Sequence, residues 1–223
     1  QLNSICAGHP EYKKGSGIET TTGPLGQGLG NSVGMAIAES IFRKKFGSDL
    51  INNKTYVICS DGDLMEGISH EAMSLAGHLK LKNLIVFFDN NKISIDGSTS
   101  LSVSDNYKKR FESYGWNFLE VNGHNEKQIS KAILKATKSN KPTLISCKTI
   151  IGFGSPNKSG KASSHGSPLG DDEISLVRKK LKWKNEPFSV PSDVLESWRE
   201  IGGKGAQLEE KWQHTLNKKS DEI

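Results

Sequence analysis

Residues 55–96 read TYVICSDGDLMEGISHEAMSLAGHLKLKNLIVFFDNNKISID, and this stretch decides the fold. An apolar run at 56–59 ends at Ser60-Asp61-Gly62-Asp63, and a second run at 84–88 ends at Asp89-Asn90-Asn91. Between the two runs, apolar residues recur at helical spacing: Ile68, Ala72, Leu75, Ala76 and Leu79. The pattern predicts strand, helix, strand. In such a βαβ unit both parallel strands end at the same edge of a sheet.

The polar residues at the two strand ends predict a metal-bridged diphosphate at that edge, where open α/β sheets bind ligands. Asp61 supplies a carboxylate, Asn91 supplies an amide oxygen, and a backbone carbonyl just after Asn91 can supply a third ligand. Oxygen ligands without thiols or histidines suit Mg²⁺ or Ca²⁺. Gly62 lets the backbone approach a ligand closely. The helix, expected to start near Leu64 or Met65, offers free N–H groups to an anion.

An ordinary structural explanation exists for each half of this pattern. Asp-Gly after a strand is a common turn, and Asn-Asn is a common loop sequence. Taken separately, each half is more typical of a turn than of a binding site. Their occurrence on consecutive parallel strands favours the metal–diphosphate interpretation.

Two other phosphate-binding patterns fail on their spacing. The glycine-rich segment 23–34 contains Gly28-x-Gly30 but has Val33 where a dinucleotide fingerprint needs its third glycine, and no apolar strand precedes it. The segment 154–163 resembles a P-loop, but its first glycine is one place too far away and Ala162 replaces the required Ser or Thr. The glycines at 23–34 instead predict a backbone passing close to a flat cofactor.

Length and composition indicate one large α/β domain. The chain has 223 residues and a formal net charge of +5, with basic residues partly concentrated at 178–184 and 218–219. These clusters lack interleaved aromatics, which disfavours nucleic-acid binding, and no apolar run approaches the ~20 residues of a membrane span. The three cysteines, Cys6, Cys59 and Cys147, form no CxxC pair. They predict a reducing, cytoplasmic compartment.

The remaining elements continue the α/β pattern. Apolar residues at every fourth position predict a core-facing helix over about 27–46, namely Leu29, Val33, Ile37 and Ile41. Strands are expected at 116–121 and 143–147, with a helix between them capped by Asn125. Helices follow after 171 and over 192–217, the latter interrupted at Gly202-Gly203. Together these predict a parallel sheet with helices on both faces.

Five phrases make the resemblance to a known family specific. GHPE at 8–11, TTGPLGQGLGN at 21–31, DGDLMEGISHEA at 61–72, NNKISIDG at 90–97 and SHGSPLG at 164–170 resemble the transketolase family in order and spacing, over nearly the whole chain. One departure is Ser60, where the family usually has glycine; serine is small, and we expect the turn to survive. The resemblance implies the thiamine-diphosphate-binding fold. Residues 1–185 would be its diphosphate- and metal-binding domain without the N-terminal part, and 186–223 a helical linker toward an absent pyrimidine-binding domain.

The resemblance also implies roles for particular residues. The metal would be held by Asp61, Asn91 and the carbonyl of Ile93. Cofactor contacts would come from Gly23, Leu25, Gly62, Asn91, Ile95, Ile151 and His165. Substrate hydroxyls and protons would be handled by His9 and His165. Interface candidates are Glu66 and Glu71.

The implied activity is transfer of a two-carbon ketol unit from a ketose phosphate of the xylulose 5-phosphate type to an aldose phosphate. It would use thiamine diphosphate and Mg²⁺ or Ca²⁺, and belong to the pentose phosphate pathway. A homodimer is expected, because in this family the partner subunit supplies the glutamate that activates the aminopyrimidine. The chain alone is therefore expected to be inactive. Two alternatives stay open: the N-terminal subunit of a split transketolase-like enzyme, and a non-catalytic nucleotide- or diphosphate-binding module.

Overall fold

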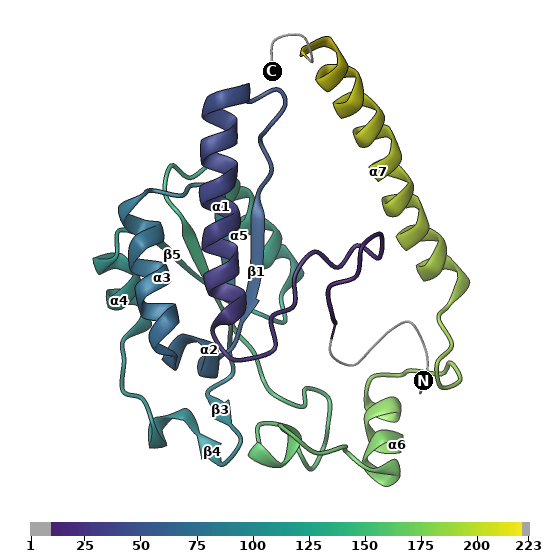
Figure 1. Ribbon diagram of the computed structural model, residues 1–223. Coiled ribbons are helices and arrows are strands. Elements are labelled where there is room, and N and C mark those ends of the chain that lie inside the picture. The colour runs from purple at the N-terminus through teal and green to yellow at the C-terminus, as the bar shows by residue number, and fades with distance from the viewer. Residues whose placement is uncertain (1–9, 220–223) are drawn as a thin grey trace.

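A computed structural model describes residues 10–219 of the chain (Figure 1). Its centre is a four-stranded sheet in the order β1-β2-β6-β5. The strands are β1 (Thr55–Cys59), β2 (Leu84–Asn90), β5 (Asn117–Asn122) and β6 (Thr143–Lys148). All three neighbouring pairs are parallel, and Cys59 lies beside Phe88 in the register of β1 and β2. The predicted βαβ unit is thus confirmed, and the polar residues that follow both strands lie at one edge.

The direction of the crossovers explains why helices cover both faces. The chain steps from β1 to β2 through α3 (Gly67–His78) and on to β5 through α4 (Tyr107–Ser113), then steps back to β6 through α5 (Glu126–Thr137). Because such crossovers are right-handed, the reversed step places α5 on the opposite face from α3 and α4. Alternate residues of β2 face the two layers: Val86 and Phe88 pack with α3 and α4, and Ile85 packs with α5.

Helix α1 (Gln27–Phe46) has the predicted bounds, but one end of its predicted core face is wrong. Leu29 and Val33 are buried, whereas Ile41 is 58% exposed. Residues four apart advance about 40° around a helix beyond a full turn, so three such steps move Ile41 about 120° away from Leu29. The buried stripe instead follows the three-and-four spacing through Ala36 and Glu39.

The helix after β1 differs from the prediction in two ways. It begins at Asp61 rather than near Leu64 or Met65, and it is split into α2 (Asp61–Met65) and α3 by the extended conformation of Glu66. The buried face of α3 is also rotated by one residue, because small polar and glycine positions take part in it: Ser69, Ala72, Met73, Ala76 and Gly77. Three predicted core residues are therefore exposed, namely Ile68, Leu75 and Leu79.

Packing against the neighbouring loop explains why Gly77 is buried. A Cβ at this position would lie 1.8 Å from the carbonyl oxygen of Tyr114 and 3.0 Å from Trp116 Cδ1. The Trp116 indole donates a 2.8 Å hydrogen bond to the carbonyl of Met73. Only glycine allows α3 to approach the segment between α4 and β5 this closely.

Short elements surround the carboxyl edge of the sheet. A small hairpin of β3 (Ile93–Ser94) and β4 (Gly97–Ser98) follows β2, and a 3-10 turn, η1 (Thr99–Leu101), comes next. After β6 the chain forms a long loop containing a second 3-10 turn, η2 (Ala162–Ser164), and then α6 (Asp171–Lys180). As predicted, the side chain of Asn125 caps α5, accepting a 3.0 Å hydrogen bond from the Gln128 amide.

The C-terminal helix α7 (Ser192–Lys219) is continuous through Gly202-Gly203, so the predicted interruption is wrong. None of its residues is buried, and in Figure 1 it stands apart from the sheet. Its far end contacts the loop after α1, where the Trp212 indole donates a 2.9 Å hydrogen bond to the Leu50 carbonyl and Lys219 pairs with Asp49. Within residues 10–219, no helix is long and apolar enough to cross a membrane.

Candidate functional site

The turn after β1 is a capped helix start. Ser60 is the N-cap of α2, and the Asp63 carboxylate accepts hydrogen bonds of 2.8 Å from both the backbone amide and the hydroxyl of Ser60. This reciprocal capping box satisfies donors that a helix start leaves unpaired. The serine that departs from the family pattern therefore supports the turn, as expected.

Asp61 is buried at this turn with one oxygen unpartnered. The residue is 3% exposed, and among the described residues its Oδ2 has no hydrogen-bond partner of normal geometry. Burial raises the pKa of Asp61 to about 6, and it outweighs the opposite effects of the nearby Lys92 amide and Tyr107 hydroxyl. A buried carboxylate of this kind is costly unless a positive charge compensates it. The site therefore suits a cation.

Asn91 lies in the turn after β2, and its side chain is hydrogen-bonded within that turn. Asn91 Nδ2 donates to Asp89 Oδ2 at 3.2 Å, and its Oδ1 accepts a 2.9 Å hydrogen bond from the Ile93 amide. Lys92 between them has a φ of 62°, a left-handed conformation uncommon outside glycine. The Lys92 amide lies close enough to the Asp61 carboxylate to lower its pKa, so this turn is next to the first one. Both turns therefore lie at the carboxyl edge of the sheet, and the sharing of one cation by Asp61 and Asn91 stays a prediction.

The residues present fit a hard cation. Among residues 10–219, no three His, Cys, Asp or Glu side chains cluster as a metal site by themselves. The predicted set is of another kind: one carboxylate, one amide oxygen and the Ile93 carbonyl. Such a set leaves an octahedral ion half open, and Mg²⁺ usually takes its other ligands from water and phosphate oxygens.

The glycine-rich segment before α1 is tied to the same turn. The Gly26 amide donates a 2.9 Å hydrogen bond to Asp63 Oδ1, and Leu25 lies so close that a Cβ on Gly62 would be 3.1 Å from its Cδ1. Gly26 has a φ of 80°, and a Cβ there would lie 2.7 Å from Ile68. Leu25 itself is half exposed. The structure therefore brings Leu25 and Gly62 together; Gly23 lies two residues earlier, also with a positive φ of 53°.

The segment after β6 is anchored to the end of β2. The Thr149 hydroxyl donates to Asp89 Oδ1, and the Thr149 amide donates to the Asn90 carbonyl at 3.3 Å. Ile151, on the loop that follows, is partly buried, and its carbonyl accepts a 2.8 Å hydrogen bond from Gly160. His165 is exposed further along. Among the described residues, no hydrogen bond or ion pair joins Ile151 or His165 to Asp61, so their cofactor roles stay predictions.

Other predicted residues lie around this centre. Ile95 is 72% exposed on the turn between β3 and β4, and Glu66 and Glu71 are exposed at the start of α3. Glu66 ends α2 and precedes α3 without making a side-chain cap. His9 lies outside the described residues.

Three residues that organise the site carried no assigned role in the sequence analysis: Asp63, Asp89 and Thr149. Asp63 could have been found, because Ser60-x-x-Asp63 is a capping-box pattern. No local signal marks the other two, since their contact joins residues 60 positions apart.

The fold defines a class: α/β domains built on a parallel sheet, whose carboxyl edge is the usual place for a ligand. Comparison with known families narrows this class. A family model described as "Transketolase, thiamine diphosphate binding domain" matches residues 1–223. The chain belongs to the transketolase family, and it corresponds to that family's thiamine-diphosphate-binding domain.

Individual relatives agree. The chain is 54% identical over 217 residues to a transketolase of Buchnera aphidicola from Acyrthosiphon pisum, covering 95% of this chain and 32% of that protein. It is 54% identical over 202 residues to transketolase 2 of Vibrio vulnificus, covering 89% of this chain and 30% of that protein. The chain thus spans about a third of the length of these relatives.

Solved structures give the same result. The crystal structure of a Campylobacter jejuni transketolase superposes with a TM-score of 0.92 at 42% identity, covering 99% of this chain and 35% of that one. A Pichia stipitis transketolase, solved in complex with sedoheptulose 7-phosphate, superposes with a TM-score of 0.86 at 41% identity. That match covers 91% of this chain and 31% of the Pichia chain.

Proposed function

We propose that this chain is the cofactor-binding part of an enzyme that transfers a two-carbon ketol unit from a ketose phosphate to an aldose phosphate. The observation that carries the proposal is the buried carboxylate of Asp61, with one oxygen unpartnered, linked through the Lys92 amide to the Asn91 turn. Family membership supports the reaction class, and a relative solved with a sugar phosphate supports the substrate class. A xylulose 5-phosphate type of donor and the pentose phosphate pathway belong to the same proposal.

Each residue at the edge has a part in this function. Asp61, Asn91 and the Ile93 carbonyl would hold Mg²⁺ or Ca²⁺, and Gly62 would let the diphosphate approach the backbone. Gly23, Leu25, Ile95 and Ile151 would offer apolar or close backbone contact to the rings of thiamine diphosphate. When bound, the cofactor supplies a carbon centre that accepts the electrons of the cleaved C–C bond.

Proton handling falls to the two histidines. His9 and His165 would contact substrate hydroxyls and move protons to and from them, a task that suits imidazole near neutral pH. His165 is exposed on the loop after β6, where a substrate could reach it. Among the described residues, no contact of His165 indicates a different role.

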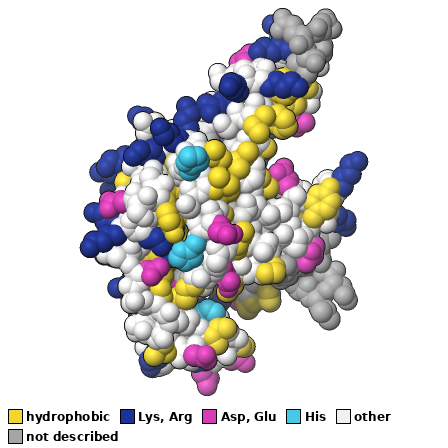
Figure 2. All heavy atoms as spheres, turned by 60° about the vertical axis from the view of Figure 1, so that its left-hand side comes forward, with side chains coloured by type: hydrophobic (Ala, Val, Ile, Leu, Met, Phe, Trp, Pro, Cys, Tyr) yellow, Lys and Arg dark blue, Asp and Glu magenta, His cyan; other side chains and the backbone are white. Residues whose placement is uncertain are grey.

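The complete activity is proposed to need more than this chain. In the resembled family, a glutamate from a pyrimidine-binding domain of the partner subunit activates the cofactor; we infer that 186–223 link toward such a domain and that the working form is a homodimer. Exposed apolar side chains on α3 and at the residue that caps its C-terminus fit a subunit contact near Glu66 and Glu71: Ile68, Leu75 and Leu79. Figure 2 shows the molecule from the side that carries α3. Hydrophobic side chains lie exposed among polar ones there, and Lys and Arg side chains gather along one margin of the view. Cytoplasmic location stays a prediction.

Cofactor binding is tested by tryptophan fluorescence of the 223-residue chain. We expect thiamine diphosphate to quench it only when Mg²⁺ or Ca²⁺ is present, and NAD and ATP to have no effect. Quenching by ATP or NAD instead would favour the alternative of a general nucleotide-binding module. Turnover of xylulose 5-phosphate should be absent from this chain alone and present in a polypeptide that also carries the pyrimidine-binding domain.

The second alternative is a split enzyme, with this chain as its N-terminal subunit. The sequence encoded after Ile223 separates the two cases. A pyrimidine-binding domain in the same reading frame supports a single polypeptide, whereas a stop followed by a separate gene for that domain supports two subunits.

A further inference from the structure

Helix α2, which carries Asp61 and Gly62, is too short to satisfy its own carbonyls. A helix leaves its last four C=O groups without intrahelical partners, so a five-residue helix needs partners from outside. The extended Glu66 (φ −66°, ψ 141°) prevents the chain from continuing the helix. Two side chains supply partners: the Ser69 hydroxyl donates to the Asp63 carbonyl, and Arg110 Nη2 donates to the Leu64 carbonyl at 3.0 Å.

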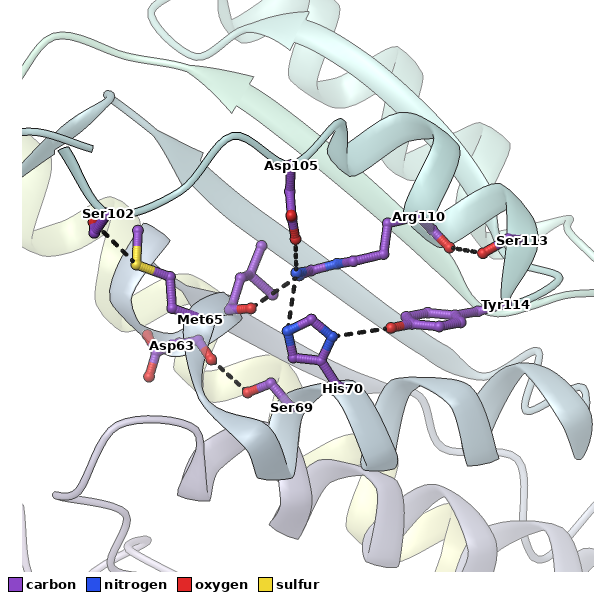
Figure 3. Close-up of polar contacts among 10 residues, drawn as sticks. Asp63, Met65, Ser69, His70, Ser102, Asp105, Arg110, Ser113 and Tyr114 are labelled. Carbon is purple, nitrogen blue, oxygen red and sulfur yellow. Dashed lines mark hydrogen bonds and ion pairs between the residues drawn. The ribbon is translucent and has the colours of Figure 1, made fainter. Parts of the chain in front are cut away.

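Arg110 is held in place by its other contacts (Figure 3). Its Nη1 donates to Asp105 Oδ2 at 2.9 Å and approaches His70 Nε2 at 3.3 Å. The guanidinium carbon lies 5.0 Å from the ring centre of Tyr107 and 5.4 Å from that of Phe111. The side chain is 11% exposed. A planar fork with several donors can serve all these partners at once, which a lysine cannot do.

The arrangement also assigns the tautomer of His70. A guanidinium only donates hydrogen bonds, so His70 Nε2 must accept from Arg110. The proton of a neutral imidazole then sits on Nδ1, which lies 3.2 Å from the Tyr114 hydroxyl and donates to it. His70 belongs to α3, Arg110 to α4 and Tyr114 to the turn after α4. The chain of hydrogen bonds therefore joins α3, α4 and the end of α2.

We propose that Arg110 is a positioning residue: by binding the Leu64 carbonyl and resting against His70, it clamps α2 and so holds Asp61 in its place at the cation site. The clamp has a second route to the same carboxylate, because the Tyr107 ring beneath the guanidinium carries a buried hydroxyl close enough to Asp61 for the two groups to interact. The role in cofactor binding rests on the proposed function; the clamping of α2 does not.

Hydrogen exchange tests the clamp without any ligand. In Arg110→Met, which keeps the apolar stem, we expect the amides of 61–66 to exchange about tenfold faster while those of β6 stay unchanged, because only the local opening free energy falls. Lys109→Met removes the same charge from an exposed neighbour, and it should leave the exchange rates of both 61–66 and β6 unchanged. Unchanged exchange at 61–66, or equal acceleration in β6, would overturn the clamp. Full protection in Arg110→Lys would show that charge suffices and the fork does not matter.

The tautomer provides a spectroscopic test. Long-range ¹H–¹⁵N NMR spectra of the wild-type chain should show His70 protonated at Nδ1 and bare at Nε2; the opposite tautomer would contradict the assignment. His70→Gln can place a carbonyl oxygen near the position of Nε2 and should retain the protection of 61–66, whereas His70→Leu should lose part of it. Equal exchange in both variants would remove His70 from the clamp.

Cofactor affinity completes the test and separates it from the proposed function. With Mg²⁺ present, Arg110→Met should raise the apparent Kd for thiamine diphosphate about tenfold, as loss of groups that orient metal ligands does, and Lys109→Met should not. Wild-type binding with an unchanged Kd in Arg110→Met would overturn the positioning role alone. If the wild type binds nothing, the proposed function fails, and the exchange result still decides whether Arg110 clamps α2.

Discussion

The carboxylate of Asp63 joins the backbone of Gly26 to the start of α2. Its Oδ1 accepts a 2.9 Å hydrogen bond from the Gly26 amide, 37 residues earlier in the chain, while its Oδ2 accepts from Ser60. One side chain therefore sets both the capped turn that carries Asp61 and the position of the glycine-rich segment. An amide in its place has a single acceptor oxygen and cannot serve all three donors.

Asp63→Asn should therefore lower the free energy of unfolding by about 1 to 2 kcal/mol, the usual cost of losing a helix cap. It should also weaken metal-dependent binding of thiamine diphosphate, because the Gly26 segment loses its hydrogen bond to the carboxylate of residue 63. Urea denaturation and fluorescence titration measure the two effects. The same substitution at exposed Asp96 should change stability by less than about 0.5 kcal/mol. Equal effects at both positions would refute the special role of Asp63.

Asp61→Asn should have opposite effects on stability and on binding. Burial raises the pKa of Asp61 to about 6, so above that pH the unloaded folded protein buries a negative charge that water solvates in the unfolded chain. Removing the charge should raise the free energy of unfolding at pH 7, without added metal, by about 1 to 3 kcal/mol. Metal-dependent quenching by thiamine diphosphate should disappear.

Ligand addition provides the control for Asp61→Asn. With saturating Mg²⁺ and thiamine diphosphate, the wild type should become more stable because it binds the ligands, and the variant should not. The difference in free energy of unfolding between the two proteins should therefore shrink or change sign. A variant less stable than the unloaded wild type would show that the Asp61 carboxylate is already compensated within the protein.

Gly77→Ala should be strongly destabilising. The added Cβ would meet the Tyr114 carbonyl oxygen at 1.8 Å, and moving that backbone costs roughly 1 to 3 kcal/mol or more by overpacking. Gly67→Ala is the matched control on the same helix, because a Cβ there meets nothing within 4 Å. The control should be neutral or slightly stabilising, by up to about 1 kcal/mol. Thermal unfolding of the two variants compares them; a tolerated Gly77→Ala would mean that α3 packs less closely than described.

Glu173 should contribute stability that is lost in acid. Its carboxylate accepts hydrogen bonds from the Ser155 hydroxyl and from the Asn157 backbone and side chain, and these lower its pKa from 4.5 to about 2. A carboxylate with a lowered pKa stabilises the fold fully above the unfolded value. That contribution disappears as the pH falls from about 4.5 to about 2.

Glu173→Gln should flatten this part of the pH profile. Urea midpoints measured between pH 2 and 6 should depend less on pH in the variant, because the acid-sensitive group that joins the first turn of α6 to the preceding loop has been removed. Glu209→Gln, on an exposed face of α7, should retain the wild-type profile. Parallel profiles for the wild type and Glu173→Gln would show that the hydrogen bonds of Glu173 do not favour its charged form.

Local patterns predicted much of the fold. The bounds of α1, the strands β1 and β2 and the Asn125 cap follow from apolar spacing and turn chemistry, which act over a few residues. Errors arose where a helix face was assigned by the size of its apolar residues. Ile68 and Leu75 face outward because Ser69 and Gly77 allow closer packing on the other side, which periodicity alone does not reveal.

The candidate site likewise contains features that the local sequence predicts and contacts that it does not. The sequence could place Asp61 and Asn91 at the same edge of the sheet, because parallel strands of one βαβ unit must end together. The contacts from Asp89 to Thr149 and from Arg110 to Leu64 join residues 60 and 46 positions apart. Neither pair leaves a local signal, since each depends on which strand and which helix become neighbours.

The sequence by itself determined the parallel unit, the oxygen-bearing side chains at its edge and the family, because all three depend on residue type and short-range spacing. Tertiary structure alone decided which groups hold those side chains in place. The clamp on α2, the tie from Gly26 to Asp63 and the buried, unpartnered oxygen of Asp61 exist only after the chain has brought distant segments together. Burial and hydrogen-bond geometry are properties of that assembled packing rather than of any one segment.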